Sequence, residues 1–320
     1  MSFFILVIVL LTLPRALSAQ EEVKLHSSGS TSVNSLIYRL AQDNGFYRDE
    51  GLNVLAITAT SQAGMQGLIA GSFDFSAIFG VGTTAILRGA PLKSVMVFDT
   101  RPLFWLYGGK KIKTLQDLKG GKIIAVSSLG ANTDQITRDV LLANRIDPRR
   151  EVVIQGIGPG SVRLQALFGG SVDATILNPL ESLIAKRQGF NELLFYGDYD
   201  LSIASGGVIA REKMLTEKRE FVRRFLRATL RAFHWVRANE KPAVTKMAEF
   251  FKISSDDAFG IYRASLKSYT ADGTIPRGLQ QRIIDAQRES LKLEKDIPPE
   301  KVFDFAIVNS LNEELKKRGS

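Results

Sequence analysis

The sequence predicts an α/β protein with two similar lobes, each a mostly parallel sheet flanked by helices. One segment of 16 residues occurs twice, as MQGLIAGSFDFSAIFG at residues 65–80 and as LQALFGGSVDATILNP at residues 164–179. The two copies align without a gap at an offset of 99 residues, with five identical positions. A Ser/Gly-rich loop precedes each copy, at residues 27–31 and 127–133. Two copies of one unit predict two lobes, and ligands usually bind in a cleft between lobes.

Within each copy the residue order predicts a helix, a tight turn and a short strand. Gly71 and Gly170 follow helical runs and suit the left-handed backbone that ends a helix. Asp74 and Asp173 come three residues later, beside apolar strands. They could form a carboxylate pair if the lobes faced each other, but the repeat explains both as structural residues.

Apolar runs and turn residues predict the remaining elements in chain order. Strands are expected at residues 23–25, 52–57, 73–79, 92–99, 123–126, 152–155, 172–177 and 203–210, and residues 189–195 close the second lobe. A turn is expected at residues 46–51. Helices are expected at residues 32–44, 80–89, 216–238, 242–251, 255–268, 276–293 and 299–317.

This order predicts a first lobe made of two separate parts of the chain. Residues 20–108 and 204–320 form the first lobe, and residues 109–203 form the second. The polar connector KKIKTLQDLK at residues 110–119 marks the passage into the second lobe. Hinge crossings are therefore expected near residues 101–110 and 198–206.

The first 19 residues are predicted to be a cleaved signal peptide. The run FFILVIVLLTL at residues 3–13 is too short to span a bilayer, and the small residues Ala16, Ser18 and Ala19 follow it. No Lys or Arg precedes the run, which departs from the usual pattern. Because the sequence has no Cys, a lipid anchor at the cleavage point is excluded. The mature protein is expected to be a soluble periplasmic monomer.

The composition excludes several kinds of site. With no Cys there can be no disulfide, Cys–zinc site or thiol nucleophile, and the two histidines, His26 and His234, are far apart in the sequence. The net charge is +9, but the basic residues are scattered and no nucleic-acid-binding signature occurs. Neither a metal, a cofactor nor a nucleic acid is therefore expected.

Catalytic patterns are also missing. There is no Walker loop or G-x-S-x-G elbow, and the glycine-rich stretch at residues 156–160 lacks the third glycine of a dinucleotide fingerprint. His26 lies two residues before Ser28, so both would point to one face of a strand, but a strand histidine is more often packed or exposed than catalytic. The chain is not expected to be an enzyme.

Six loops at predicted strand ends are rich in Gly, Ser, Thr and Asn. In a parallel α/β lobe such loops meet the ligand, and free N–H groups at helix starts favour an anionic or strongly polar one. The same residue types are common helix caps, which is the better interpretation of any single residue. As a set contributed by both lobes, they predict a ligand-binding cleft. Arg101 is a possible charge partner near the first crossing, although a surface position is favoured.

Several motifs together resemble a known family. They are LAQDNGFYRDEGLNV at 40–54, GMQGLIAGSFDFSAIFG at 64–80, LKGGKIIAVSSLGA at 118–131, the second repeat copy and TADGTIP at 270–276. In this order they are similar to solute-binding proteins of ABC transporters, in the subgroup that carries sulfonates, nitrate, taurine or thiamine-pyrimidine precursors. The likeness covers essentially the whole mature chain. It implies a type 2 periplasmic binding fold that closes around a small solute and delivers it to an inner-membrane permease.

The resemblance also implies the site residues. It places Ser30, Thr31, Gln62, Gly82, Thr83, Asn132, Thr133 and Asn178 in the cleft, and Ser28 and Ser128 in the same Ser-rich loops complete the predicted ligand-binding set. Two alternatives remain. A periplasmic sensor subunit for a membrane kinase would share these features, whereas a pyrimidine-synthase-like enzyme is disfavoured because it needs a Cys-rich motif. Porphobilinogen deaminase, which has the same lobe design, needs a Cys for its cofactor.

Overall fold

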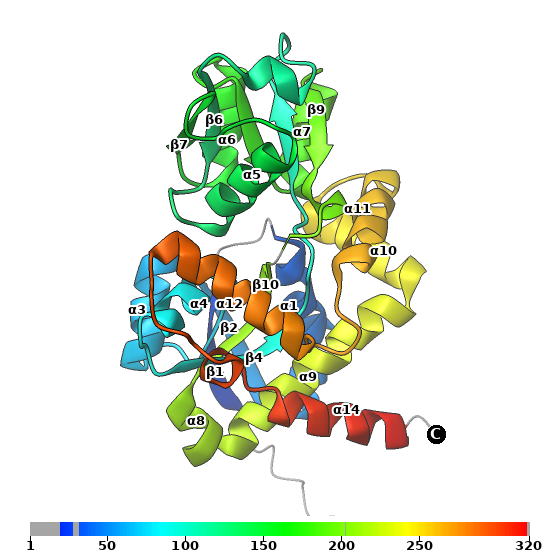
Figure 1. The fold of residues 1–320 in the computed structure, drawn as a ribbon. Helices are drawn as coiled ribbons and strands as arrows, with labels where there is room; N and C mark the ends of the chain where they lie inside the picture. Colours follow the sequence, from blue (N-terminus) through cyan, green and yellow to red (C-terminus); the bar gives the residue numbers. More distant parts are fainter. Residues whose placement is uncertain (1–19, 28–31, 202, 319–320) are drawn as a thin grey trace, which may run out of the picture.

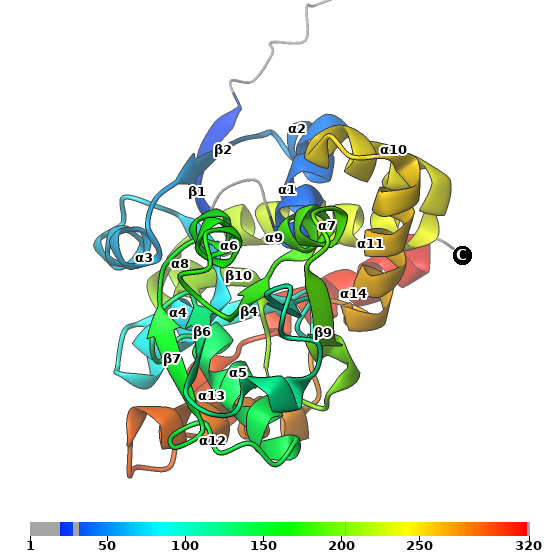
Figure 2. The same ribbon diagram turned by 90° about the horizontal axis from the view of Figure 1, so that it is seen from above.

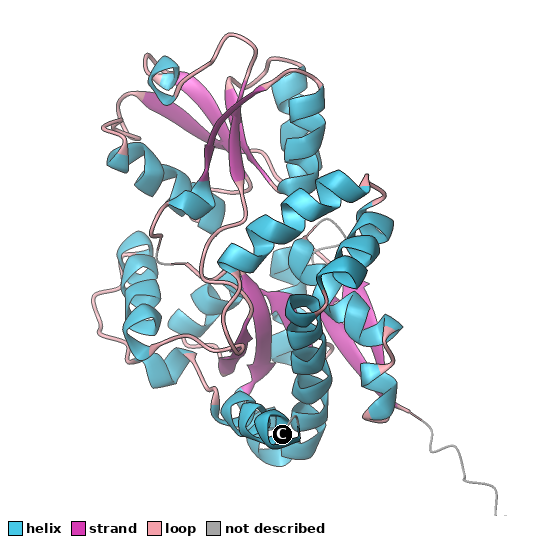
Figure 3. Cartoon of the chain, turned by 90° about the vertical axis from the view of Figure 1, so that its right-hand side faces the viewer, coloured by secondary structure: helices cyan, strands magenta, loops and turns pink. Residues whose placement is uncertain are grey.

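The computed structural model describes residues 20–27, 32–201 and 203–318. They form two lobes, each built on a five-stranded mixed sheet with helices on both faces (Figures 1 and 3). Each sheet has a separate apolar cluster on either face. The predicted two-lobed α/β architecture is therefore confirmed.

In the first lobe, four strands run in one direction and one runs against them. The spatial order is β2-β1-β3-β10-β4. Strands β1 and β2, and β1 and β3, pair in parallel, whereas β10 pairs antiparallel with both β3 and β4. The bounds are β1 Glu21–Ser27, β2 Leu52–Thr58, β3 Phe75–Ile78, β4 Leu92–Val97 and β10 Gly206–Arg211.

The second lobe repeats this arrangement in the order β7-β6-β8-β5-β9. Strands β6, β7 and β8 are parallel, and the reversed strand β5 pairs with β8 and β9. The bounds are β5 Trp105–Gly108, β6 Lys122–Val126, β7 Val152–Gly156, β8 Ala174–Leu177 and β9 Asn191–Phe195. Strand β5 thus occupies the place in the second sheet that β10 occupies in the first.

Fourteen α-helices cover the sheets in the described part of the chain. In Figure 2, α6 and α7 of the second lobe lie in front of the first lobe's elements. The bounds are α1 Val33–Asp43, α2 Phe46–Asp49, α3 Ser61–Ala70, α4 Phe79–Leu87, α5 Asn132–Ala143, α6 Gly160–Phe168, α7 Pro179–Arg187, α8 Glu212–Glu217, α9 Arg219–Ala238, α10 Glu240–Phe251, α11 Ser255–Ser268, α12 Arg277–Leu291, α13 Pro299–Val302 and α14 Ala306–Arg318.

The long helix α9 closes the larger core of the first lobe. Its apolar residues recur at helical spacing, so one face is buried while the arginines of the other face stay at the surface. Phe225 stacks on Phe75 of β3 with 4.0 Å between ring centroids, and Tyr47 of α2 also stacks on Phe225, at 5.6 Å. Packing therefore explains the aromatic residues of this helix.

The repeated aspartates have the same structural role in both lobes. The Asp74 carboxylate accepts a hydrogen bond from the Lys24 backbone N–H at 2.9 Å, and Asp173 accepts one from Ile123 N–H at 2.9 Å. The backbone N–H of each aspartate returns a bond to the carbonyl of the same partner. Each aspartate joins the turn after a helix to the neighbouring strand, as the repeat predicted. Gly71 and Gly170 have φ of 88° and 72°, in the left-handed region.

Three local predictions were wrong. Strand Trp105–Gly108 was not predicted and was assigned to the first lobe, but it pairs in the second sheet. Its pairing partners are distant in the sequence, so no local pattern reports it. Residues 46–49 form a short helix instead of a turn, and the helix predicted at 299–317 is broken where Phe303 forms a bridge with Ser94.

Candidate ligand cleft

Two segments of chain cross between the lobes and lie side by side. Asp99, just after β4, joins them: its carboxylate accepts from Ser205 N–H at 2.7 Å and from Gly206 N–H at 3.3 Å. It also accepts from the Asn34 side-chain amide of α1 at 2.6 Å. Burial raises the pKa of Asp99 to about 6. The hydrogen bonds favour the ionised carboxylate and so oppose this rise. Arg101, exposed on the first crossing, donates to the Gly197 carbonyl at 3.2 Å. Arg101 therefore links the two crossings.

The carboxyl ends of the two sheets face each other across these crossings. Asn132 begins α5 after β6 in the second lobe, and Gly80 is the second residue of α4, which follows β3 in the first. A Cβ on Gly80 would lie 2.6–2.7 Å from the side-chain amide of Asn132. The amide of Asn132 thus rests directly on the bare Cα of Gly80, and this contact brings the two predicted loop sets together.

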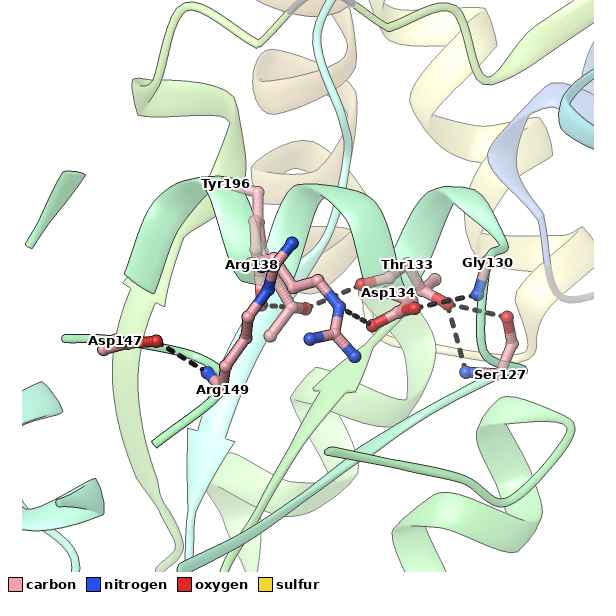
Figure 4. A network of polar contacts seen from close by, with 9 residues as sticks. Ser127, Gly130, Thr133, Asp134, Arg138, Asp147, Arg149 and Tyr196 are labelled. Atoms are coloured by element: carbon pink, nitrogen blue, oxygen red, sulfur yellow. Dashed lines mark hydrogen bonds and ion pairs between the residues drawn. The ribbon is translucent and has the colours of Figure 1, made fainter. Parts of the chain in front are cut away.

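Thr133 and Asp134, the next two residues of α5, are occupied within their own lobe (Figure 4). Thr133 Oγ1 accepts from Ser127 N–H at 3.0 Å and bonds the Ser127 hydroxyl at 2.6 Å. Asp134 accepts from Gly130 N–H at 2.8 Å and from Arg138 Nε at 2.7 Å. These bonds fix the loop after β6 and so position Asn132, whereas the buried Thr133 side chain is used structurally.

A second cluster of polar side chains lies at the ends of β7 and β8. Glu181 of α7 is 4% exposed, and Gly160, the first residue of α6, leaves room for it: a Cβ there would lie 2.7 Å from Glu181 Oε1 and 2.9 Å from Asn178 Nδ2. Arg163, 2% exposed, donates from Nε to the Ile176 carbonyl at 3.0 Å and also to the Gly158 carbonyl. Burial lowers the pKa of Arg163 to about 10 and raises that of Glu181.

The first lobe has a histidine at the corresponding edge. His26, fully buried near the end of β1, bonds the Ser76 hydroxyl through Nδ1 at 2.9 Å, and its Nε2 lies 3.4 Å from the Ala59 carbonyl. A Cβ on Gly64 of α3 would lie 1.9 Å from that Nε2, so α3 approaches the ring through a glycine. Burial lowers the pKa of His26. Of the two positions expected for this histidine, packed or exposed, the structure has the packed one.

Ser28, Ser30 and Thr31 lie outside the described residues. Gln62, at the start of α3, and Ser128 are exposed, while Asn178 is half-buried at the start of α7 beside Glu181.

Gly82 and Thr83 are both buried within α4. A Cβ on Gly82 would lie 1.9 Å from Ile209 Cδ1 of β10, so this glycine lets helix and sheet approach. The hydroxyl of Thr83 donates to the Phe79 carbonyl one turn earlier, at 3.1 Å. Close packing at Gly82 and the backbone hydrogen bond of Thr83 account for the residue types, and ligand contact at both positions stays a prediction.

Helix α7 of the second lobe also contacts the first lobe. Leu180 and Leu183 pack against the larger core cluster of the first lobe, and Arg187 forms an ion pair with Asp257 of α11. Because Glu181 lies between the two leucines, its helix start is at the boundary between the lobes. The predicted loops included Gly80 and Glu181 without singling out either residue, and Asp99 was not recognised. For Glu181 the available signal was an acidic residue two positions after the second copy, where the first lobe has Gly82.

Comparison with known proteins decides the family. A family model described as NMT1/THI5 like matches residues 32–243. The chain belongs to this NMT1/THI5-like family. Among curated proteins, a search with the sequence finds no match.

Solved structures show the same fold at low sequence identity. A putative periplasmic sulfonate-binding protein from Methylobacillus flagellatus KT has a TM-score of 0.72 and 17% identity, over 93% of this chain and 96% of its own. The periplasmic nitrate-binding protein from Synechocystis PCC 6803 has a TM-score of 0.70 and 14% identity, over 93% and 89%. The desulfurization enzyme DSZB has a TM-score of 0.65 and 13% identity, over 92% and 99%. This member of the NMT1/THI5-like family therefore has the periplasmic binding protein fold.

No helix among residues 20–27, 32–201 and 203–318 is long and apolar enough to cross a membrane. In the same part of the chain, no group of three or more His, Cys, Asp or Glu side chains is placed to hold a metal ion.

Proposed function

We propose that this protein is the extracytoplasmic solute-binding component of an ABC importer, which closes its lobes on a small polar solute and presents it to a membrane permease. The contact between Asn132 and Gly80 carries the proposal, because it brings together two helix starts, one from each lobe, that follow the carboxyl ends of their strands. Sulfonate- and nitrate-binding proteins share the fold. The cleft offers helix-start N–H groups and amide side chains, which suit an anionic or strongly polar group.

Closure is expected to bring Asn132 onto Gly80. A methyl group at Gly80 would overlap the Asn132 amide, so Gly80→Ala should hold the lobes apart. Gly278→Ala is a matched control, since a Cβ at Gly278 of α12 meets no atom within 4 Å. Combining Gly80→Ala with Asn132→Gly should restore closure by removing the obstructing side chain.

A thermal-shift screen of small sulfonates, carboxylates, nitrate and pyrimidines should first identify a ligand, since binding to the folded state raises its stability. Small-angle scattering should then show a smaller radius of gyration with ligand in the wild type and in Gly278→Ala, but not in Gly80→Ala. Asn132→Ala should weaken binding by about 1–3 kcal/mol if it leaves a polar partner unpaired. An unchanged scattering profile at saturating ligand would contradict the closure mechanism.

A further inference from the structure

Glu181 is a buried acidic residue whose hydrogen-bonding capacity is only partly used. Its Oε2 atom is buried and has no hydrogen-bond partner within the described residues. Burial raises the pKa of the Glu181 carboxyl group, whereas hydrogen bonding by its own backbone N–H and by the Asn178 amide acts to lower it. Native structures seldom leave a buried carboxylate oxygen without a donor, because removing it from water is costly.

The buried Arg163, whose charge acts on Glu181, does not supply that donor. Arg163 directs Nε and Nη1 to the carbonyls of Ile176 and Gly158, and Glu181 Oε2 has no hydrogen bond from any described residue. Its positive charge still favours the ionised form of the carboxyl group. Glu181 therefore keeps an acceptor that nothing in the second lobe fills.

The fold itself does not require this glutamate. The repeat offset of 99 residues matches Glu181 with Gly82, which lies at the same point of the first lobe. There the space is filled by the Ile209 side chain of β10. In the first lobe, helix α4 thus starts after β3 without a carboxylate. The architecture that the lobes share therefore does not explain why Glu181 is buried in the second lobe.

The position of Glu181 supplies the reason. It follows the carboxyl end of β8, adjoins the start of α6 after β7, and belongs to the helix start whose Leu180 packs against the first lobe. Resting on the proposed solute-binding function, we propose that Glu181 Oε2 accepts a hydrogen bond from an N–H group of the solute. The solute is then an anionic or acceptor-rich molecule that also carries an amine, amidine or amino-heterocycle donor.

Matched ligand pairs test this assignment. Each pair compares an amino compound with its methyl counterpart: taurine with propane-1-sulfonate, β-alanine with butyrate, and 4-aminopyrimidine with 4-methylpyrimidine. Calorimetry is carried out on the wild type, on Glu181→Gln and on Glu151→Gln. Glu151 lies just before β7, at the opposite end of the sheet from the cleft, and serves as the matched control.

We expect at least one amino compound to bind the wild type tenfold or more tightly than its methyl counterpart. Glu181→Gln should remove this preference by weakening the amino compound tenfold or more, with less than a twofold change for the methyl compound. Glu151→Gln should retain it. The melting temperature of ligand-free Glu181→Gln should equal or exceed that of the wild type, which shows that the variant folds.

Equal binding within every pair, or a preference that survives in Glu181→Gln, would overturn the inference and leave the proposed function standing. Failure of all three amino compounds to bind would also overturn it. The solute screen and the scattering measurement then decide the proposed function separately, because neither depends on Glu181.

Discussion

In the first lobe, strand β1 carries the buried His26 and helix α3 carries Gly64, whereas the matching residues of the second lobe are Ala125 and Arg163. The bulky polar group thus lies on the strand in one lobe and on the helix in the other. A second helix position shows the same difference: it is Gly82 in the first lobe and the charged Glu181 in the second.

The features that the lobes share are those that hold strand to turn. Both retain the aspartate that bonds a neighbouring strand and the glycine that ends the preceding helix. The repeat therefore specifies the architecture, while the positions between helix and sheet are packing residues in one lobe and polar residues in the other.

The largest effect is expected from Gly64→Ala. The added methyl would lie 1.9 Å from the His26 ring, which is held by Ser76 and cannot move without losing that bond. Overpacking of this kind should destabilise the protein by about 3 kcal/mol or more in chemical denaturation. The double variant His26→Ala with Gly64→Ala should be more stable than Gly64→Ala alone. If the single variant matches the wild type, α3 does not depend on this close approach.

A smaller effect is expected from Asp99, which belongs to the crossings and not to the repeat. Its folded-state pKa of about 6 exceeds the ordinary value of 3.8, so between these values the folded protein binds a proton that the unfolded chain lacks. The stability from this proton is present at low pH and is lost as pH rises through 6, by at most about 3 kcal/mol.

Asp99→Asn cannot bind that proton. Its stability relative to the wild type should therefore rise between pH 4 and pH 7. The expected change is roughly 2 kcal/mol, below the limit because the carboxyl group of the unfolded chain is still partly protonated at pH 4. The asparagine oxygen can still accept from Ser205 and Gly206, which preserves the geometry of the crossings. A constant difference between the two proteins across this pH range would show that Asp99 does not titrate as described.

The smallest effects are expected from the two repeated aspartates. Asp74→Ala and Asp173→Ala each remove an acceptor from a strand N–H, and each should cost about 1–2 kcal/mol in urea denaturation. The costs should be similar and should add in the double variant, because the sites are in different lobes. Exposed Asp200→Ala is the control. A large cost in one lobe alone would mean that the shared bond does not have a shared role.

The sequence allowed the two lobes and most elements to be predicted, because repeated glycines and aspartates are local signals. Strand β5 escaped because its pairing with β8 and β9 is formed between distant residues. The loops of the cleft were recognisable from their composition. The roles of their individual side chains could not be predicted. Asn132 contacts the other lobe, whereas the adjacent Thr133 is buried in its own, and this difference depends on how the helix is oriented.

The position of β10 has a consequence for the order in which the chain can fold. All five strands of the second sheet lie within residues 105–195, so this sheet can assemble from one continuous segment. The first sheet cannot, because β3 and β4 are joined only by β10, which follows the whole second lobe in the sequence. Until residue 211 is available, β3 and β4 each present an open edge, a surface prone to aggregation. The second lobe is thus suited to form early, and the long-range closure of the first sheet is the slow step.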